Sequence, residues 1–261
     1  MIEHDLWLKD NFKNRNIVLL YNRVIIEYDL RSAGINLCEE YHLLDKDDMK
    51  KLRELPKKDA TVQLGKMQIK NTKLKEGLKS AFQDIRRRFF EENSLEKEDI
   101  LSVKKDAIFT LKEVPVTKFG ICEFARKNQY SAFMRLGELE FYYNYDKLDV
   151  KGIGDDVLDK HKDYMLHFIH MLFYKMENDT EYEVKRYFTR FYSRYKLREL
   201  ELGYYREFSV NSNFRVIEDD VIYDNEAFIP YDDKRYRLDI GYNFQHILLP
   251  LVILILDEDI T

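Results

Sequence analysis

Apolar and polar residues alternate along this chain in two different spacings, which divide it into strand-like and helix-like stretches. Residues 17–29 and 100–111 contain short apolar runs with many β-branched residues, a pattern typical of strands. The first stretch predicts two strands that turn near residues 21–23, and the second predicts a hairpin. Residues 114–145 alternate aromatic and apolar positions and predict further strands, with Gly137 in a turn.

Other stretches carry apolar residues at spacings of three, four and seven, which is typical of an amphipathic helix. Residues 66–93 predict one long helix, with Gly77 as a place where it can break. A short helix is expected over residues 32–41, and two or three helices are expected over residues 157–195. The apolar run at residues 247–256 is interpreted as a buried strand or as an edge that binds a partner.

The order of these elements predicts an α+β protein, in which an antiparallel sheet with packed helices precedes a mostly helical part. The pattern changes at Asp146, and Gly152 and Gly154 follow soon after. We therefore expect an α+β domain over residues 1–145 and a helical region with a mixed C-terminal segment over residues 146–261.

Composition narrows the class of protein further. With 45% hydrophobic residues among 261, the chain can bury a core, and its net charge of −5 excludes a globally basic surface. Any contact with nucleic acid must then come from local patches. Cys38 and Cys122 form no CxxC pair, which argues against a zinc site and favours a reducing compartment. Because no apolar run is long enough to span a membrane, we expect a cytoplasmic protein without a membrane partner.

Two aspartates occupy the strand-like stretches. Asp29 comes where the first stretch ends and a helix begins, and Asp106 lies near the tip of the predicted hairpin. Carboxylates on neighbouring strands can hold a pair of divalent metal ions, the arrangement used for in-line nucleotidyl transfer. The simpler alternative is that Asp29 caps the following helix and that Asp106 only occupies a turn.

Basic residues follow one face of the expected long helix. Lys66, Lys70 and Lys73 fall at positions i, i+4 and i+7, so they lie on the same side. They can bind triphosphate or backbone phosphates, or they can form an ordinary solvated face. The three arginines at residues 86–88 point around too much of the helix to define one patch. We interpret them as solvated or as a contact to nucleic acid.

The second half of the chain offers two further candidates. His167 and His170 can share a metal ion, although packing among aromatic residues is the simpler interpretation. Residues 187–195 interleave aromatic and basic side chains. These can stack on single-stranded bases, or the aromatic residues can pack a core while the arginines extend to solvent.

The order of these motifs resembles the palm of family B DNA polymerases. Their first palm motif, Asp-x-x-Ser-Leu-Tyr-Pro, is matched at Asp29 and Ser32 but not at the Tyr-Pro. Their hairpin motif, Asp-Thr-Asp-Ser, is matched at Asp106, with Lys104 in place of the first Asp. Their finger-helix motif, Lys-x-x-x-Asn-Ser, is similar to residues 66–72, one residue out of register.

Two more segments follow in the same order as in that family. Residues 127–130 resemble a Lys-x-Tyr element that contacts the primer terminus, and residues 147–153 resemble the strand that leads into the thumb. Together, the resemblance covers about residues 20–175. It carries over three nucleic-acid contacts: Lys127, Tyr130 and Lys151.

The resemblance implies a palm followed by a thumb, and a metal-dependent nucleotidyltransferase that acts on or near DNA. It makes Asp29 and Asp106 the catalytic residues that hold Mg²⁺ or Mn²⁺, with the backbone carbonyl of Leu30 also facing a metal. The nucleotide would be bound by the lysines of the finger helix, Lys66, Lys70 and Lys73.

Other features favour a protein that has lost catalysis. Lys104 and Lys105 flank Asp106 and would partly replace the charge of a metal. The fingers would be truncated, and the net charge is acidic. The alternative is therefore an inactive, polymerase-derived module for nucleic-acid binding or assembly, of phage origin judged from the usage of Lys, Asn, Tyr and Ile. A third interpretation is an α+β interaction protein with a protein partner, in which the motifs are coincidental.

Overall fold

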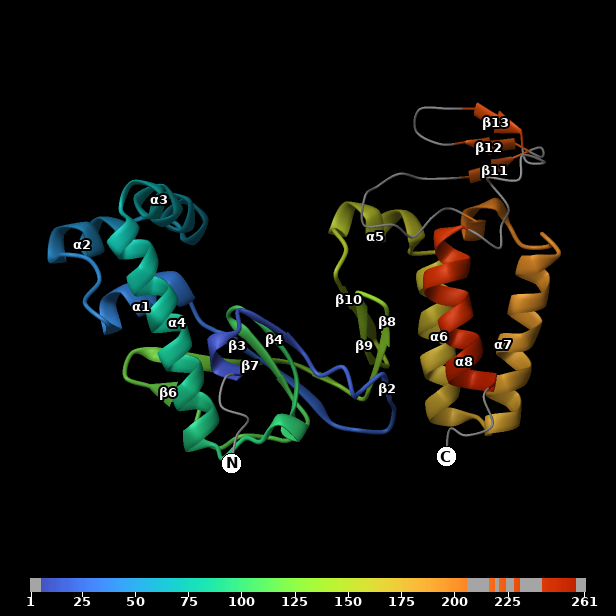
Figure 1. Ribbon diagram of the computed structural model, residues 1–261, viewed down its shortest axis with the longest axis horizontal. Helices are drawn as coiled ribbons and strands as arrows, with labels where there is room; N and C mark the ends of the chain where they lie inside the picture. Colours follow the sequence, from blue (N-terminus) through green and yellow to red (C-terminus); the bar gives the residue numbers. More distant parts are fainter. Residues whose placement is uncertain (1–5, 206–215, 219–220, 224–227, 231–240, 257–261) are drawn as a thin grey trace. The chain divides into compact units, whose positions relative to one another are not determined.

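The computed structural model describes residues 6–205, 216–218, 221–223, 228–230 and 241–256. The predicted α+β class is confirmed, with antiparallel sheets and, after the sheet region, a run of helices (Figure 1). The chain forms two compact units, which are described one by one. The first contains Met1–Asn16 and Val24–Gln129, and the second contains Ile17–Arg23 and Tyr130–Thr261.

We expected a boundary between residues 145 and 146. The two units instead divide the chain between residues 129 and 130, and residues 17–23 belong to the second unit. Strands β8 (Ala132–Leu136) and β9 (Leu139–Asn144) belong to the second unit, because β8 also pairs with β2 (Leu19–Leu20). The two strands expected within residues 17–29 are present as β2 and β3 (Ile25–Leu30), but they pair with β8 and β5 (Ala107–Thr110) and not with each other. Strand β2 belongs to the second unit, whereas β3 belongs to the first.

A six-stranded sheet forms the base of the first unit. The strand order is β1 (Asn11–Lys13), β4 (Ile100–Lys104), β5 (Ala107–Thr110), β3, β7 (Cys122–Tyr130) and β6 (Lys118–Phe119). The predicted hairpin is confirmed as β4 and β5, where Lys104 pairs with Ala107 across a two-residue turn, Lys105 and Asp106. Strand β3 runs antiparallel to β5 and places Asp29 opposite Ala107.

Four α-helices lie between β3 and the hairpin: α1 (Ala33–Glu40), α2 (Lys46–Glu54), α3 (Lys57–Lys70) and α4 (Thr72–Glu92). Helix α1 confirms the predicted short helix. The single long helix expected over residues 66–93 is wrong, because Asn71 has an extended backbone (φ −130°, ψ 97°) and separates α3 from α4. The side chain of Asn71 accepts a hydrogen bond from the backbone N–H of Leu74 and so caps α4.

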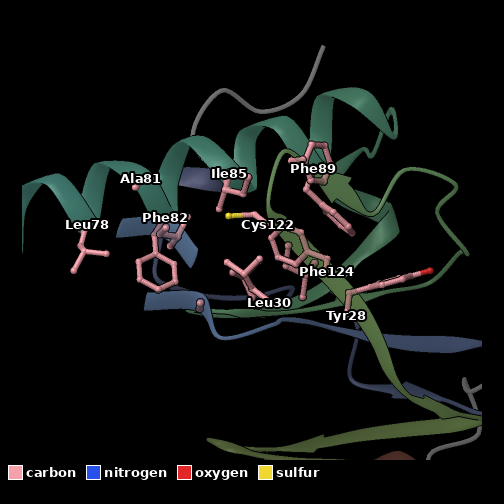
Figure 2. Packing of buried hydrophobic residues seen from close by; sticks show 14 of the residues in the cluster. Tyr28, Leu30, Leu78, Ala81, Phe82, Ile85, Phe89, Cys122 and Phe124 are labelled. Atoms are coloured by element: carbon pink, nitrogen blue, oxygen red, sulfur yellow. The ribbon is translucent and has the colours of Figure 1, made fainter. Parts of the chain in front are cut away.

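Helix α4 covers the sheet through the apolar stripe that its periodicity predicts. Figure 2 shows Leu78, Phe82, Ile85 and Phe89 pointing from the same side of the helix, with Ile85 and Phe89 above Leu30, Tyr28 and Phe124 of the strands. The ring of Phe89 lies 4.5 Å from that of Phe124 and 5.6 Å from that of Tyr28, centroid to centroid. Because full burial of one large apolar side chain contributes about 1.5–3 kcal/mol, this stripe fixes α4 over β3.

The second unit combines a four-stranded sheet with helices. The sheet has the order β10 (Lys147–Lys151), β9, β8, β2, and the turn between β8 and β9 contains Gly137 at φ +60°, as predicted. The two or three helices expected over residues 157–195 are confirmed as α5 (Asp155–His161), α6 (Met165–Asn178) and α7 (Glu181–Lys196). Short elements follow: η3 (Leu202–Tyr205), β11 (Val216–Glu218), β12 (Val221–Tyr223) and β13 (Phe228–Pro230).

The apolar run at residues 247–256 is helical, so its interpretation as a strand is wrong. A π-helical turn, η6 (Phe244–Leu248), leads directly into α8 (Leu249–Leu256). The wider π turn comes just before Pro250, whose nitrogen carries no hydrogen to donate to an α-helical ladder. Helix α8 buries Leu251 and Ile255 in the core of the second unit, together with residues of α6 and α7.

Candidate active site

The structure brings Asp29 and Asp106 close together in the first unit, one on a strand and the other in the adjoining hairpin turn. Asp29 is the fifth residue of β3, and Asp106 is the second residue of the turn that joins β4 to β5. The backbone N–H of Leu30 donates to the carbonyl oxygen of Asp106 at 2.9 Å, which ties the turn to the end of β3. The alternative role of Asp29 as a helix cap is wrong, because Ser32 occupies the N-cap position of α1.

Asp29 lies in a crowded set of charges. Burial raises the pKa of its carboxyl group, Lys127 lowers it, and the negative charges of Asp106 and Glu27 raise it further, so that the net direction is upward. The Nζ atom of Lys127 lies 3.6 Å from Oδ1 of Asp29 and 3.6 Å from Oε1 of Glu27. The side chain of Glu27 is buried and accepts a hydrogen bond from the amide of Asn128. Three carboxylates and one ammonium group therefore lie near the C-terminal end of β3.

Arg86 holds the hairpin turn in place from helix α4. Its buried guanidinium donates to the carbonyl oxygens of Trp7 (2.9 Å) and Lys105 (2.8 Å), and to Oδ1 of Asp10 (3.0 Å). Lys105 has a left-handed backbone, at φ +53°, and its N–H donates to the carbonyl oxygen of Asp10. The interpretation of Arg86 as a solvated or nucleic-acid-binding residue is therefore wrong. It is a buried support for the turn that carries Asp106.

A cleft of about 620 Å³ opens beside the two aspartates. Asp29, Lys105 and Asp106 line it from β3 and the hairpin turn, residues 32–35 line it from the start of α1, and α3 and α4 line it with three further lysines. Acidic Asp10 and Glu76 also contribute to the lining. Basic and hydroxyl or amide side chains thus face the same hollow as the carboxylates: Lys57, Thr61, Gln68, Thr72, Lys75 and Lys79.

The lysines predicted to bind a nucleotide are not the ones that line this cleft. Lys66 and Lys70 lie on α3, Lys73 lies on α4, and all three are exposed. The break at Asn71 places them on two helices, so the single basic face expected from their spacing does not form. The sequence of α4 does contain a pattern that predicts the lysines of the cleft. Lys75 and Lys79 are four residues apart and next to the apolar positions Leu78 and Phe82.

A family model described as "Bacteriophage PBS1 gene 130 protein" matches residues 1–256. The chain belongs to this family. No curated protein matches the chain. The name of the family agrees with the phage origin suggested by residue usage.

The remaining predicted nucleic-acid contacts lie in different surroundings. Lys127 extends from β7 into the carboxylates described above. Tyr130 is buried, and its hydroxyl donates to Oδ2 of Asp149 at 2.6 Å. Lys151 ends β10 and is half-buried. Contact of these residues with nucleic acid stays a prediction.

The described residues can be compared with the ligand sets that metal ions need. Across those residues, no three or more His, Cys, Asp or Glu side chains are placed to hold a metal ion together. His170 lies with its ring 5.1 Å from that of Tyr143, and His167 is exposed on α6. No helix within the described residues is long and apolar enough to cross a membrane.

Proposed function

We propose that this member of the phage family is a nucleotidyltransferase of the polymerase-palm type, which acts on DNA. One observation carries the proposal: a single cleft brings Asp29 and Asp106 to the same space as Lys57, Lys75 and Lys79. Carboxylates that hold divalent metal and lysines that pair with phosphates are the two components that phosphoryl-transfer sites combine.

The two carboxylates fit Mg²⁺ or Mn²⁺ bound together with a substrate. Mg²⁺ usually takes one or two protein carboxylates and completes its shell with waters and substrate phosphates, so a larger cluster of protein ligands is not required. The charge of Asp106 and Glu27 helps to raise the pKa of Asp29, and a cation at this place relieves that repulsion. When bound, the metal would activate a 3′-hydroxyl and stabilise the leaving pyrophosphate.

The protein's own groups have separate roles in this proposal. The lysines on α3 and α4 bind the phosphates, which positions the nucleotide against the strand edge. Lys127, 3.6 Å from Asp29, lowers the pKa of this carboxyl and favours its charged form. Arg86 fixes the turn and therefore the position of Asp106.

Primer extension tests the proposal directly. The wild-type protein is assayed with Mg²⁺ or Mn²⁺ beside Asp29→Asn, Asp106→Asn and the control Asp47→Asn, whose residue is exposed on α2. Each tenfold in rate corresponds to about 1.4 kcal/mol, and metal stabilisation of transition-state charge is worth several kcal/mol. We therefore expect at least about a 100-fold loss in the first two variants and none in the control. Extension that persists in both site variants would refute the proposal.

A second candidate is a non-catalytic module that binds nucleic acid. Lys104 stands where the polymerase hairpin has its first aspartate, and the ammonium group of Lys127 already lies beside Asp29 and Glu27. This candidate predicts no extension together with tight binding of single-stranded DNA that weakens as salt rises. If neither extension nor DNA binding is found, the remaining interpretation is an interaction protein.

A further inference from the structure

A second hollow lies in the second unit, where α7 meets α6 and the segment that follows α7. Its volume is about 350 Å³, within the range of small-ligand pockets. Arginine, histidine and tyrosine side chains dominate the lining, with one carboxylate. The lining residues are His167, Tyr187, Arg190, Phe191, Arg194, Leu200, Glu201 and Tyr204.

Two arginines give the pocket a positive side. Arg190 and Arg194 stand four residues apart on α7, so their side chains lie on one face of the helix, and both are exposed. One N–H of Arg194 donates to the carbonyl oxygen of Glu199 at 2.9 Å. Among the described residues, Arg190 has no ion-pair partner. Guanidinium groups bind phosphate oxygens in pairs of hydrogen bonds, and the exposed His167 on α6 adds a further donor.

Aromatic rings form the other side, and their packing holds them in place. Tyr187 stacks on Phe168 with the centroids 5.9 Å apart and has the Nζ atom of Lys175 over its ring at 5.3 Å, so it offers a ligand its edge. Phe191 meets Tyr204 edge to face at 5.5 Å. Burial, with a smaller contribution from Tyr204, raises the pKa of Tyr187 to about 12, so its hydroxyl stays a neutral donor. Rings fixed in advance lose little entropy when a flat ligand stacks on them.

Charges of both signs act on the hydroxyl of Tyr204. Burial raises the pKa of the Tyr204 hydroxyl, Glu201 raises it further, and Arg194 lowers it. The pocket therefore carries one carboxylate as well as its two guanidinium groups, and Tyr204 has a charged neighbour of each sign. The two guanidinium groups favour an anionic group, and the aromatic part of the lining favours a ring.

We propose that this pocket binds a nucleotide unit, with the phosphate on Arg190 and Arg194 and the base against Tyr204 and the edge of Tyr187. The unit can be a free nucleotide or part of a single strand, because the two share the same phosphate and ring. This site is independent of the carboxylates of the first unit and needs no metal.

The test uses the full chain carrying Lys57→Ala, Lys75→Ala and Lys79→Ala, in EDTA, so that neither the phosphate-binding lysines nor a metal ion in the first-unit cleft contributes. Binding of a fluorescent single-stranded oligonucleotide is measured by anisotropy, and adenosine monophosphate is used as a competitor. Arg190→Glu is compared with Arg186→Glu, an exposed arginine one turn earlier on α7 that does not line the pocket. Both variants change the net charge equally, and thermal melts check that both are folded.

We expect Arg190→Glu to weaken binding at least about tenfold and Arg186→Glu less than about twofold, since a lost charge-assisted contact to phosphate is worth about 1.5–3 kcal/mol. Competition by the monophosphate identifies a site for free nucleotides, and binding of the strand alone identifies a strand site. The proposal is overturned if both variants weaken binding equally, if a polyglutamate peptide competes as well as the strand, or if neither ligand binds.

Discussion

The cleft beside the two aspartates and the pocket on α7 are built in different ways. The cleft of the first unit places carboxylates from a strand and a hairpin turn opposite lysines from two helices, so that segments between residues 10 and 106 must meet. The pocket of the second unit comes mainly from one helix, α7, and its residues lie between 167 and 204. A site assembled from distant segments depends on buried supports such as Arg86. A site on one helix depends mostly on the periodicity of that helix.

Among the variants that test this comparison, we expect the largest effect from Arg86→Ala, which lowers the free energy of unfolding. The change removes three hydrogen bonds and leaves the carbonyl groups of Trp7 and Lys105 without their buried donor, which costs roughly 2–4 kcal/mol. The matched control is Arg87→Ala, which removes a half-buried ion pair to Asp84 and a more exposed one to Glu91, worth about 0.2–1 kcal/mol each. Urea denaturation measures both, and equal losses would contradict the structural role of Arg86.

The next effect separates the lysines that line the first-unit cleft from those that do not. Replacing Lys57, Lys75 and Lys79 together by alanine is expected to weaken binding of a nucleoside triphosphate by about 10- to 100-fold, since three exposed contacts to phosphate are lost. The control replaces Lys66, Lys70 and Lys73, which removes the same charge from the same two helices. Calorimetric titration decides between them, and a larger loss in the control set would restore the assignment made from sequence spacing.

These two comparisons also show where sequence reasoning succeeds. Local periodicity was sufficient for α4, because burial of Leu78, Phe82, Ile85 and Phe89 follows the helical repeat. The β4–β5 hairpin and its aspartate were predictable because a two-residue turn between apolar runs is a local event. The proximity of Asp29 to Asp106 was expected from the order of the strand and the hairpin.

The failures share a different physical cause. The apolar stripe continues across Asn71, so the spacing alone hides the cap that divides the helix, and with it the lysines that reach the cleft. The partner of β2 lies more than a hundred residues away, at β8, and no local pattern fixes such a pairing. The burial of Arg86 was not predictable, because its acceptors are mostly backbone carbonyl groups. Every residue has such a group, so the sequence does not show which ones an arginine will contact.

A smaller effect is expected in the second unit from Tyr130→Phe. The change removes the hydroxyl that donates to Asp149, while Lys147 stays 2.7 Å from the same carboxylate. We expect a loss of about 0.5–1.5 kcal/mol in the free energy of unfolding and unchanged affinity for single-stranded DNA. A large loss of DNA affinity without loss of stability would favour the predicted role in nucleic-acid contact.

The smallest effect concerns pH and Asp29. Its pKa is raised in the folded state, so the stability associated with its protonation is present below the ordinary pKa and is lost as pH rises through the folded value. Asp29→Asn removes this penalty and is expected to raise the melting temperature relative to wild type near neutral pH, but not below about pH 4. Asp47→Asn on the surface is the control. A gain that does not depend on pH would contradict this explanation.

The most direct test of the central claim is equilibrium binding of a nucleoside triphosphate with and without Mg²⁺. The cleft geometry predicts Mg²⁺-dependent affinity that falls at least about tenfold in Asp29→Asn and in Asp106→Asn, while Arg190→Glu leaves this Mg²⁺-dependent component unchanged. Binding that is the same in EDTA, or that survives both aspartate substitutions, would contradict the claim that the two carboxylates and the cleft lysines form one site.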